Sequence, residues 1–192
     1  MLVFGLSDAK LRHRRFRQNE EAIFREFFEV SHGDTDLTPA IIAKKAGISR
    51  STFYRHHRSV YRIRPDYEKY ISQKYKSVMR PLKKKYETDK LLYKMLIFIS
   101  QNRRLLTPLM EENGEKLAKN MLTFIGRKVS KEYNFPDYPG TLFDIYTGGA
   151  AALLMDWRKT GFVETEIEQI CRNLIFLAKN TAKRLSPIDY KV

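Results

Sequence analysis

The sequence predicts an all-α protein in which a small N-terminal module of three helices is joined to a larger helical body. Apolar residues recur at the 3.6-residue spacing of helix faces along most of the chain. Turn signals separate these segments at Gly47, at 133–140 (YNFPDYPG) and at Gly161. A chain of 192 residues is long enough to bury the cores of both parts. We expect residues 1–62 to form the module and residues 63–192 the linker helix and body.

The net charge of +14 is concentrated in the first part of the chain. Residues 1–85 contain 20 Lys and Arg against 9 Asp and Glu, a net charge of +11. Residues 86–192 contain 16 against 13, a net charge of +3. A basic surplus on one module favours a polyanion as partner, because displaced counterions supply much of the affinity for nucleic acid.

Several classes of protein find no support in the sequence. No apolar run reaches the 18 or so residues of a membrane span, and the single cysteine, Cys171, excludes an internal disulfide framework. The chain has no Gly-rich phosphate loop, no paired cysteines and no G-x-S-x-G. His56 and His57 are adjacent on an expected helix and point about 100° apart, which makes a poor metal pair. We therefore expect a cytoplasmic protein that is not an enzyme, with no cofactor, metal or membrane contact.

The first helix is expected from Leu11 to about Ser31. Its start is basic, and an arginine there is as well explained by a solvated helix end as by a phosphate contact. The apolar stripe comprises Phe16, Ile23, Phe24, Phe27 and Phe28, and the basic start holds Arg12, Arg14, Arg15 and Arg17.

The stretch from Thr38 to Arg58 predicts two short helices joined by a sharp turn. Thr38 is a helix-capping residue and is followed by Pro39, which suits the first helical position. Gly47 stands where a helix end needs a left-handed residue. Ser49 caps a second helix, which is expected from Arg50 to about His57.

This layout is a helix-turn-helix, and its residues resemble the signature of the tetracycline-repressor (TetR) family of bacterial regulators. That signature reads approximately T-x-x-x-I-A-x-x-A-G-V-S-x-x-T-h-Y-x-H-F, with h apolar. The alternative is a plain helical hairpin, which gains little from so many hydrogen-bonding side chains. The matching residues are Thr38, Ile42, Ala43, Ala46, Gly47, Ile48, Ser49, Thr52, Phe53, Tyr54 and His56.

The resemblance implies that double-stranded DNA is the partner and that the second helix lies in its major groove. Arg50, Ser51 and Arg55 lie on the first turns of that helix, and we expect them to contact base edges. The family pattern assigns a second set to phosphates, which fix the register on the duplex. That set is Thr38, Ser49, Thr52, Tyr54 and His56.

Three residues depart from the family pattern at the edge of this surface. His57 replaces an aromatic residue, Val60 replaces a phosphate-binding lysine, and Pro65 is expected to delay or kink the next helix until Pro65 or Asp66. Pro81 predicts a further kink or break. These departures leave an alternative open: an adaptor or co-regulator with the same fold that acts mainly through protein–protein contacts.

The body is expected to contain helices near 88–101, 113–133, 141–159 and 165–185. The resemblance implies that the last two helices form a dimer interface and that the body holds a pocket for a small-molecule effector. For the interface we expect Gly148, Gly149, Ala152, Leu174, Ala178 and Thr181. The pocket candidates, for each of which simple core packing is the favoured alternative, are Tyr93, Phe98, Met121, Phe124, Tyr146 and Trp157.

Together these features predict a homodimeric, sequence-specific transcriptional regulator that binds a palindromic operator. Of the two kinds of regulator, we expect a repressor. The two-fold symmetry of such a protein is mirrored in the half-sites of its DNA.

Overall fold

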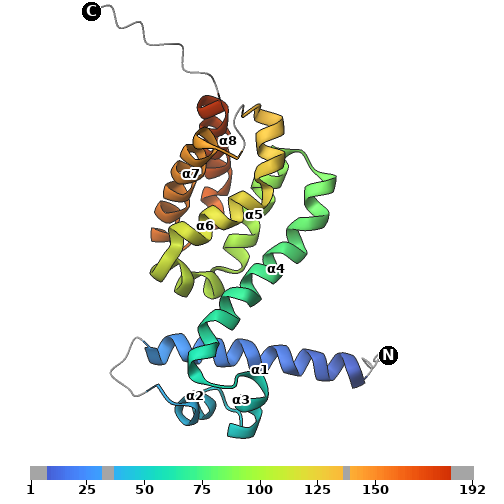
Figure 1. Cartoon of the computed structure of the whole chain (residues 1–192), viewed down its shortest axis with the longest axis vertical. Helices are drawn as coiled ribbons and strands as arrows, with labels where there is room; N and C mark the ends of the chain where they lie inside the picture. Colours follow the sequence, from blue (N-terminus) through green and yellow to red (C-terminus); the bar gives the residue numbers. More distant parts are fainter. Residues whose placement is uncertain (1–7, 32–36, 136–138, 183–192) are drawn as a thin grey trace, which may run out of the picture. The chain divides into compact units, whose positions relative to one another are not determined.

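The computed structural model describes residues 8–31, 37–135 and 139–182, with the side chains of residues 8–13 left out. The described residues are mostly helical and include no strand, which confirms the all-α expectation (Figure 1). The elements are α1 (Asp8–Ser31), α2 (Pro39–Lys45), α3 (Arg50–His56), the 3₁₀ turn η1 (Val60–Arg62), α4 (Ile63–Lys85), α5 (Thr88–Gln101), α6 (Arg103–Tyr133), α7 (Thr141–Lys159), the 3₁₀ turn η2 (Glu164–Glu166) and α8 (Ile167–Ala182).

The chain divides into two compact units, residues 1–70 and residues 71–192. From the sequence we expect the domain boundary between residues 62 and 63, before the linker helix. In the structure it falls inside α4, because the first turns of this helix pack on α1 through rings such as Tyr67, which lies 4.6 Å from Phe24.

The core of the first unit is built from the apolar stripe of α1. Ile23, Phe24 and Phe28 are buried, as expected from their spacing, and Phe53 of α3 and Ile63 of α4 are fully buried with them. Phe16 differs from the expectation, since 45% of its surface is exposed. Phe16 lies nearer the start of α1, and its ring is outside the core.

The turn between α2 and α3 follows the expected capping. Thr38 Oγ1 accepts a hydrogen bond from the Ile41 amide (3.3 Å), and Ser49 Oγ accepts one from the Thr52 amide (3.1 Å). Gly47 has a φ of +67°, which an L side chain adopts only with strain. Thr38 thus fixes where α2 begins, Gly47 where it ends and Ser49 where α3 begins.

The prolines affect α4 less than the sequence suggests. The helix begins at Ile63, and Pro65 occupies its first turn, where an amide needs no partner within the helix. The expected start at Pro65 or Asp66 is therefore wrong by a few residues. Beyond Pro81, α4 continues to Lys85.

The second unit contains the rest of α4 and helices α5 to α8. Helix α7 packs against α6 and α8, and α5 packs against α8. Tyr75 of α4 donates to the Met121 carbonyl (2.9 Å), and Ser100 of α5 donates to the Phe162 carbonyl (2.7 Å). Helix α6 extends the helix expected at 113–133 back to Arg103 across a kink at Asn113 (φ −154°, ψ 46°). Within the described ranges, no helix combines the length and the apolar character needed to cross a bilayer.

Candidate functional site

One face of α3 presents a set of exposed hydrogen-bonding side chains. Successive residues of a helix turn by about 100°, so Arg50, Ser51, Tyr54 and Arg55 fall on the same side. All four are exposed, and Tyr54 has 54% of its surface accessible. Phe53 points the other way and is fully buried, which anchors the helix in the unit.

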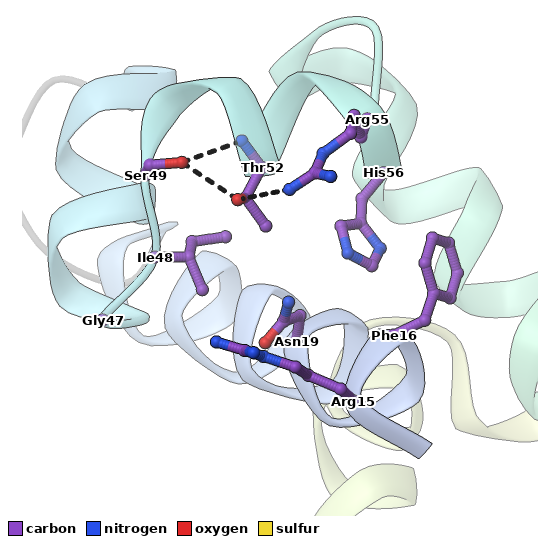
Figure 2. A pocket seen from close by; sticks show the side chains of 9 residues that line it. All are labelled: Arg15, Phe16, Asn19, Gly47, Ile48, Ser49, Thr52, Arg55 and His56. Carbon is purple, nitrogen blue, oxygen red and sulfur yellow. Dashed lines mark hydrogen bonds between the residues drawn. The ribbon is translucent and has the colours of Figure 1, made fainter. Parts of the chain in front are cut away.

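A chain of hydrogen bonds runs along the edge of α3. Ser49 Oγ and Thr52 Oγ1 lie 2.9 Å apart, and the Arg55 guanidinium donates to Thr52 Oγ1 (2.9 Å) (Figure 2). Ser49 Oγ also lies 2.9 Å from Ser51 Oγ. The Ser49 hydroxyl that caps α3 is thereby linked through the Thr52 hydroxyl to the Arg55 side chain.

Beside this edge is an open pocket between α1 and α3, with a volume of about 640 Å³. Figure 2 shows the α1 wall of the pocket below α3, with Asn19 on the side towards α3 and the Arg15 side chain lying along α1. The pocket is thus lined by cationic and amide groups together with apolar side chains such as Ile48. The lining residues are Arg15, Phe16, Asn19, Gly47, Ile48, Ser49, Thr52, Arg55 and His56.

His56 stands in this pocket as a neutral ring. It stacks on Phe16 with the ring centroids 4.0 Å apart. Burial, with the charges of His57 and Arg55 as smaller causes, lowers the pKa of His56 to about 4. Its Nδ1 is buried and has no hydrogen-bond partner among the described residues. At neutral pH, His56 therefore offers one N–H donor and no charge.

His57, the next residue, connects the end of α3 to α4. Its side chain is buried, and Nδ1 lies 3.0 Å from Asp66 Oδ2. The other Asp66 oxygen accepts a bond from the Arg62 guanidinium (3.3 Å). Burial lowers the pKa of His57, while the Asp66 carboxylate acts against this shift. Neutral His57 donates Nδ1–H to Asp66, so the departure from the expected aromatic residue creates a polar contact.

The whole segment around α3 is basic. Residues 37–65 contain seven Lys and Arg and no Asp or Glu. Within it, Val60 is buried with 6% exposed, whereas the neighbouring Tyr61 is 92% exposed. Tyr61 has the largest exposed fraction among the large apolar and aromatic side chains that the structure describes.

The eight expected DNA-binding residues all belong to the first unit, and seven of them lie on α3 or at its cap. Thr38 stands apart at the cap of α2, where its hydroxyl is used within the chain. Sequence reasoning missed Asn19 and the role of Phe16. The spacing Arg15–Asn19, one turn of α1, was a usable signal, because residues four apart share a helix face.

The expected effector-pocket residues lie in the second unit. Phe98, Met121, Tyr146 and Trp157 are buried, and Tyr93 and Phe124 are half-buried. Trp157 donates its indole N–H to the Val163 carbonyl (3.1 Å).

The expected dimer residues divide into two groups. Leu174 and Ala178 are fully buried within their own unit, so they belong to its core rather than to its surface. Ala152 is exposed. Gly148, Gly149 and Thr181 are partly exposed. A Cβ placed on Gly148 meets nothing within 4 Å, whereas one on Gly149 meets Leu177 at 2.9 Å.

Among the residues described, no group of three or more His, Cys, Asp or Glu side chains is placed to hold a metal ion. No protein-family model matches the sequence, and a comparison with curated proteins yields no match.

Proposed function

We propose that the protein is a sequence-specific DNA-binding transcriptional regulator in which α2 and α3 act as a helix-turn-helix. The observation that carries the proposal is the exposed face of α3. Arg50, Ser51 and Arg55 offer donors and acceptors of the kind that read base edges in the major groove. They stand in a segment of 29 residues, 37–65, that contains seven cations and no acid, which suits a polyanionic partner. The resemblance to TetR-family regulators points to the same role.

Phosphate contacts in this proposal come from both sides of the pocket. Thr52 and His56 supply neutral donors from α3, and Arg15 supplies a charge from α1. A neutral His56 suits this role because a donated N–H needs no protonated ring. Contacts of this kind set the register of α3 on the duplex without reading sequence.

Homodimerisation through α7 and α8 completes the proposal. Besides Gly148 and Ala152, these helices expose Ile145 (55%) and Phe176 (69%). Large apolar side chains beside small residues are typical of an interface that lets helices approach closely. An isologous dimer carries two copies of α3, as a palindromic operator requires. The regulator is proposed to act as a repressor.

A small-molecule effector would bind in the second unit. The observation that favours such a ligand is Tyr146, whose hydroxyl is fully buried and has no hydrogen-bond partner among the described residues. The ring centroids of Phe135 and Phe143 lie 5.7 and 5.9 Å from the centroid of the Tyr146 ring. A ligand with one hydrogen-bonding group would satisfy this hydroxyl. We expect compounds that bind here to raise the melting temperature and to release DNA, and Tyr146→Phe to weaken both effects.

The proposed function is tested by selecting duplexes from a randomised library and by footprinting the protein on genomic DNA. We expect a palindromic consensus and a footprint at one or a few promoters. The adaptor alternative predicts no consensus, no footprint and co-purification of a protein partner.

A further inference from the structure

We propose that the η1 turn is a second contact with the DNA backbone, in which the Tyr61 hydroxyl donates to one phosphate and Arg58 pairs with a neighbouring one. This inference rests on the proposed function. It adds Tyr61 and Arg58 to the interface, and it places part of the binding energy outside α3 and the pocket.

The packing of the turn fixes which side chains face outward. Val60 and Ile63, three residues apart, are buried with 6% and 0% exposed. Tyr61 lies between them and is 92% exposed, and Arg58 and Arg62 are exposed as well. The apolar pair holds the backbone of the turn in the core. An aromatic ring and basic side chains are thereby left in solvent.

The turn is also held in a defined position relative to α3. His57, the residue that caps the end of α3, lies 3.0 Å from one oxygen of Asp66. Arg62 of the turn donates to the other oxygen at 3.3 Å. One buried ring and one carboxylate thus connect α3, η1 and α4. A contact surface held in this way loses less conformational entropy on binding than a mobile loop does.

The chemistry of the surface favours phosphate over protein. A tyrosine hydroxyl and a guanidinium are both phosphate donors, and hydrogen bonds to charged acceptors are the stronger kind. The cores of protein–protein interfaces are depleted of charged residues. By contrast, Tyr61 is flanked by Arg58, Arg62 and Arg64. Arg62 is paired with Asp66 and Arg64 lies 3.6 Å from Glu68, so Arg58 is the cation proposed for the phosphate. The turn continues directly from the proposed recognition helix, so one duplex is able to cover both.

The test measures the affinity of the full chain for its selected duplex as a function of salt. Tyr61→Phe removes only the hydroxyl, so we expect affinity to fall roughly tenfold with no change in salt slope. Arg58→Gln removes a charge, so we expect the slope of log K against log salt to fall by about 0.9. Both positions are exposed, and neither substitution is expected to change the melting temperature.

Two variants in the second unit serve as matched controls. Arg104→Gln removes an exposed charge and Tyr86→Phe removes a hydroxyl, both outside the unit that contains the turn, and neither should alter affinity or slope. If the wild type prefers its selected duplex while Tyr61→Phe and Arg58→Gln bind it unchanged, the inference is wrong and the proposed function stands. The same holds if the two variants keep DNA affinity but lose a co-purifying protein. If the wild type prefers no duplex, both the inference and the proposed function fail.

Discussion

His57 lies with its ring buried and its Nδ1 3.0 Å from an oxygen of Asp66, across the junction between α3 and α4. The other ring nitrogen, Nε2, is buried and has no partner among the described residues. Protonation would place an N–H at this nitrogen with nothing to accept it, which is costly in a buried site. The buried site therefore favours the neutral form of the His57 imidazole.

The first prediction concerns the stability of the protein against pH. Both histidines have a pKa below the ordinary 6.5, so the unfolded chain binds protons first as pH falls. The free energy of unfolding is then highest above the ordinary value and decreases on acidification, for His56 until pH reaches about 4. We expect the melting temperature to fall between about pH 7 and pH 5.5.

His57→Phe is the matched variant for this prediction. A phenyl ring fills the same buried place beside Phe24, and Asp66 keeps its bond to Arg62. We expect a smaller loss of melting temperature over the same pH range. Burial raises the pKa of Glu20, so the folded chain binds this proton before the unfolded chain does, and Glu20 acts on the stability in the opposite direction in both proteins. A variant with the same pH dependence as the wild type would show that His57 is not the titrating group.

The second prediction concerns the turn before α3. Gly47→Ala is expected to lower the free energy of unfolding by about 1–2 kcal/mol, because an L side chain is strained at a φ of +67°. The space around a Cβ at this position is open, so the cost is in the backbone alone. Gly47→Asn is the control, since Asn tolerates the left-handed region better and should cost less. Equal costs in thermal or urea unfolding would contradict this account of the turn.

The third prediction distinguishes contacts with DNA phosphates, which fix the register of the protein on the duplex, from contacts with base edges, which read the sequence. Tyr54→Phe removes the hydroxyl proposed to bind a phosphate, and we expect affinity to fall roughly tenfold. Selected and random duplexes should weaken by the same factor, because the phosphate backbone is common to both. Gel-shift titrations of the two duplexes measure this. A loss confined to the selected duplex would assign Tyr54 to base reading.

The fourth prediction concerns the dimer. Ala152 is exposed on α7, and Ala152→Glu is expected to place an unpaired charge in the interface at a cost of several kcal/mol. Light scattering should show a monomer with an unchanged helical circular-dichroism signal and lost operator affinity. Ala178→Glu is a contrasting variant: the residue is fully buried, so the unit itself should unfold. A wild type that is monomeric at micromolar concentration would contradict the prediction.

Gly148, on the same proposed dimer face, allows a test in which helix stability and dimer affinity change in opposite directions. A methyl group there meets nothing of its own chain, so Gly148→Ala should stabilise the helix of an isolated subunit by up to about 1 kcal/mol. If a partner helix packs against Gly148, the same methyl group should weaken the dimer. Analytical ultracentrifugation and thermal unfolding measure the two effects separately. Unchanged dimer affinity would remove Gly148 from the interface.

Local rules account for much of the fold. The caps Thr38 and Ser49 and the left-handed Gly47 each act within four residues, and all three have the expected conformations. Helix spacing also predicts α5 and α7 closely, since a buried face and a turn signal suffice. The start of α4 is predicted less well, because a proline in a first turn is compatible with a helix that begins before it.

Features of the candidate site that depend on tertiary packing were not predictable. Phe16 belongs to the apolar stripe of α1 by spacing, yet its place against His56 depends on how α1 and α3 pack. The exposure of Tyr61 depends on the burial of Val60. In the second unit, the periodicity of α8 does not distinguish a core residue such as Leu174 from an interface residue, because both are apolar.

The most direct test of the central claim compares wild type and Arg55→Ala on every single-base-pair variant of the selected operator. The Arg55 side chain is exposed on α3, and an arginine that reads guanine contributes roughly 1–3 kcal/mol at one base pair. We predict that Arg55→Ala loses about that much on the operator and no longer discriminates at one symmetric pair of positions, while its other preferences persist. An Arg55→Ala protein that ranks and binds all variants as the wild type does would contradict the proposal that α3 reads sequence through this residue.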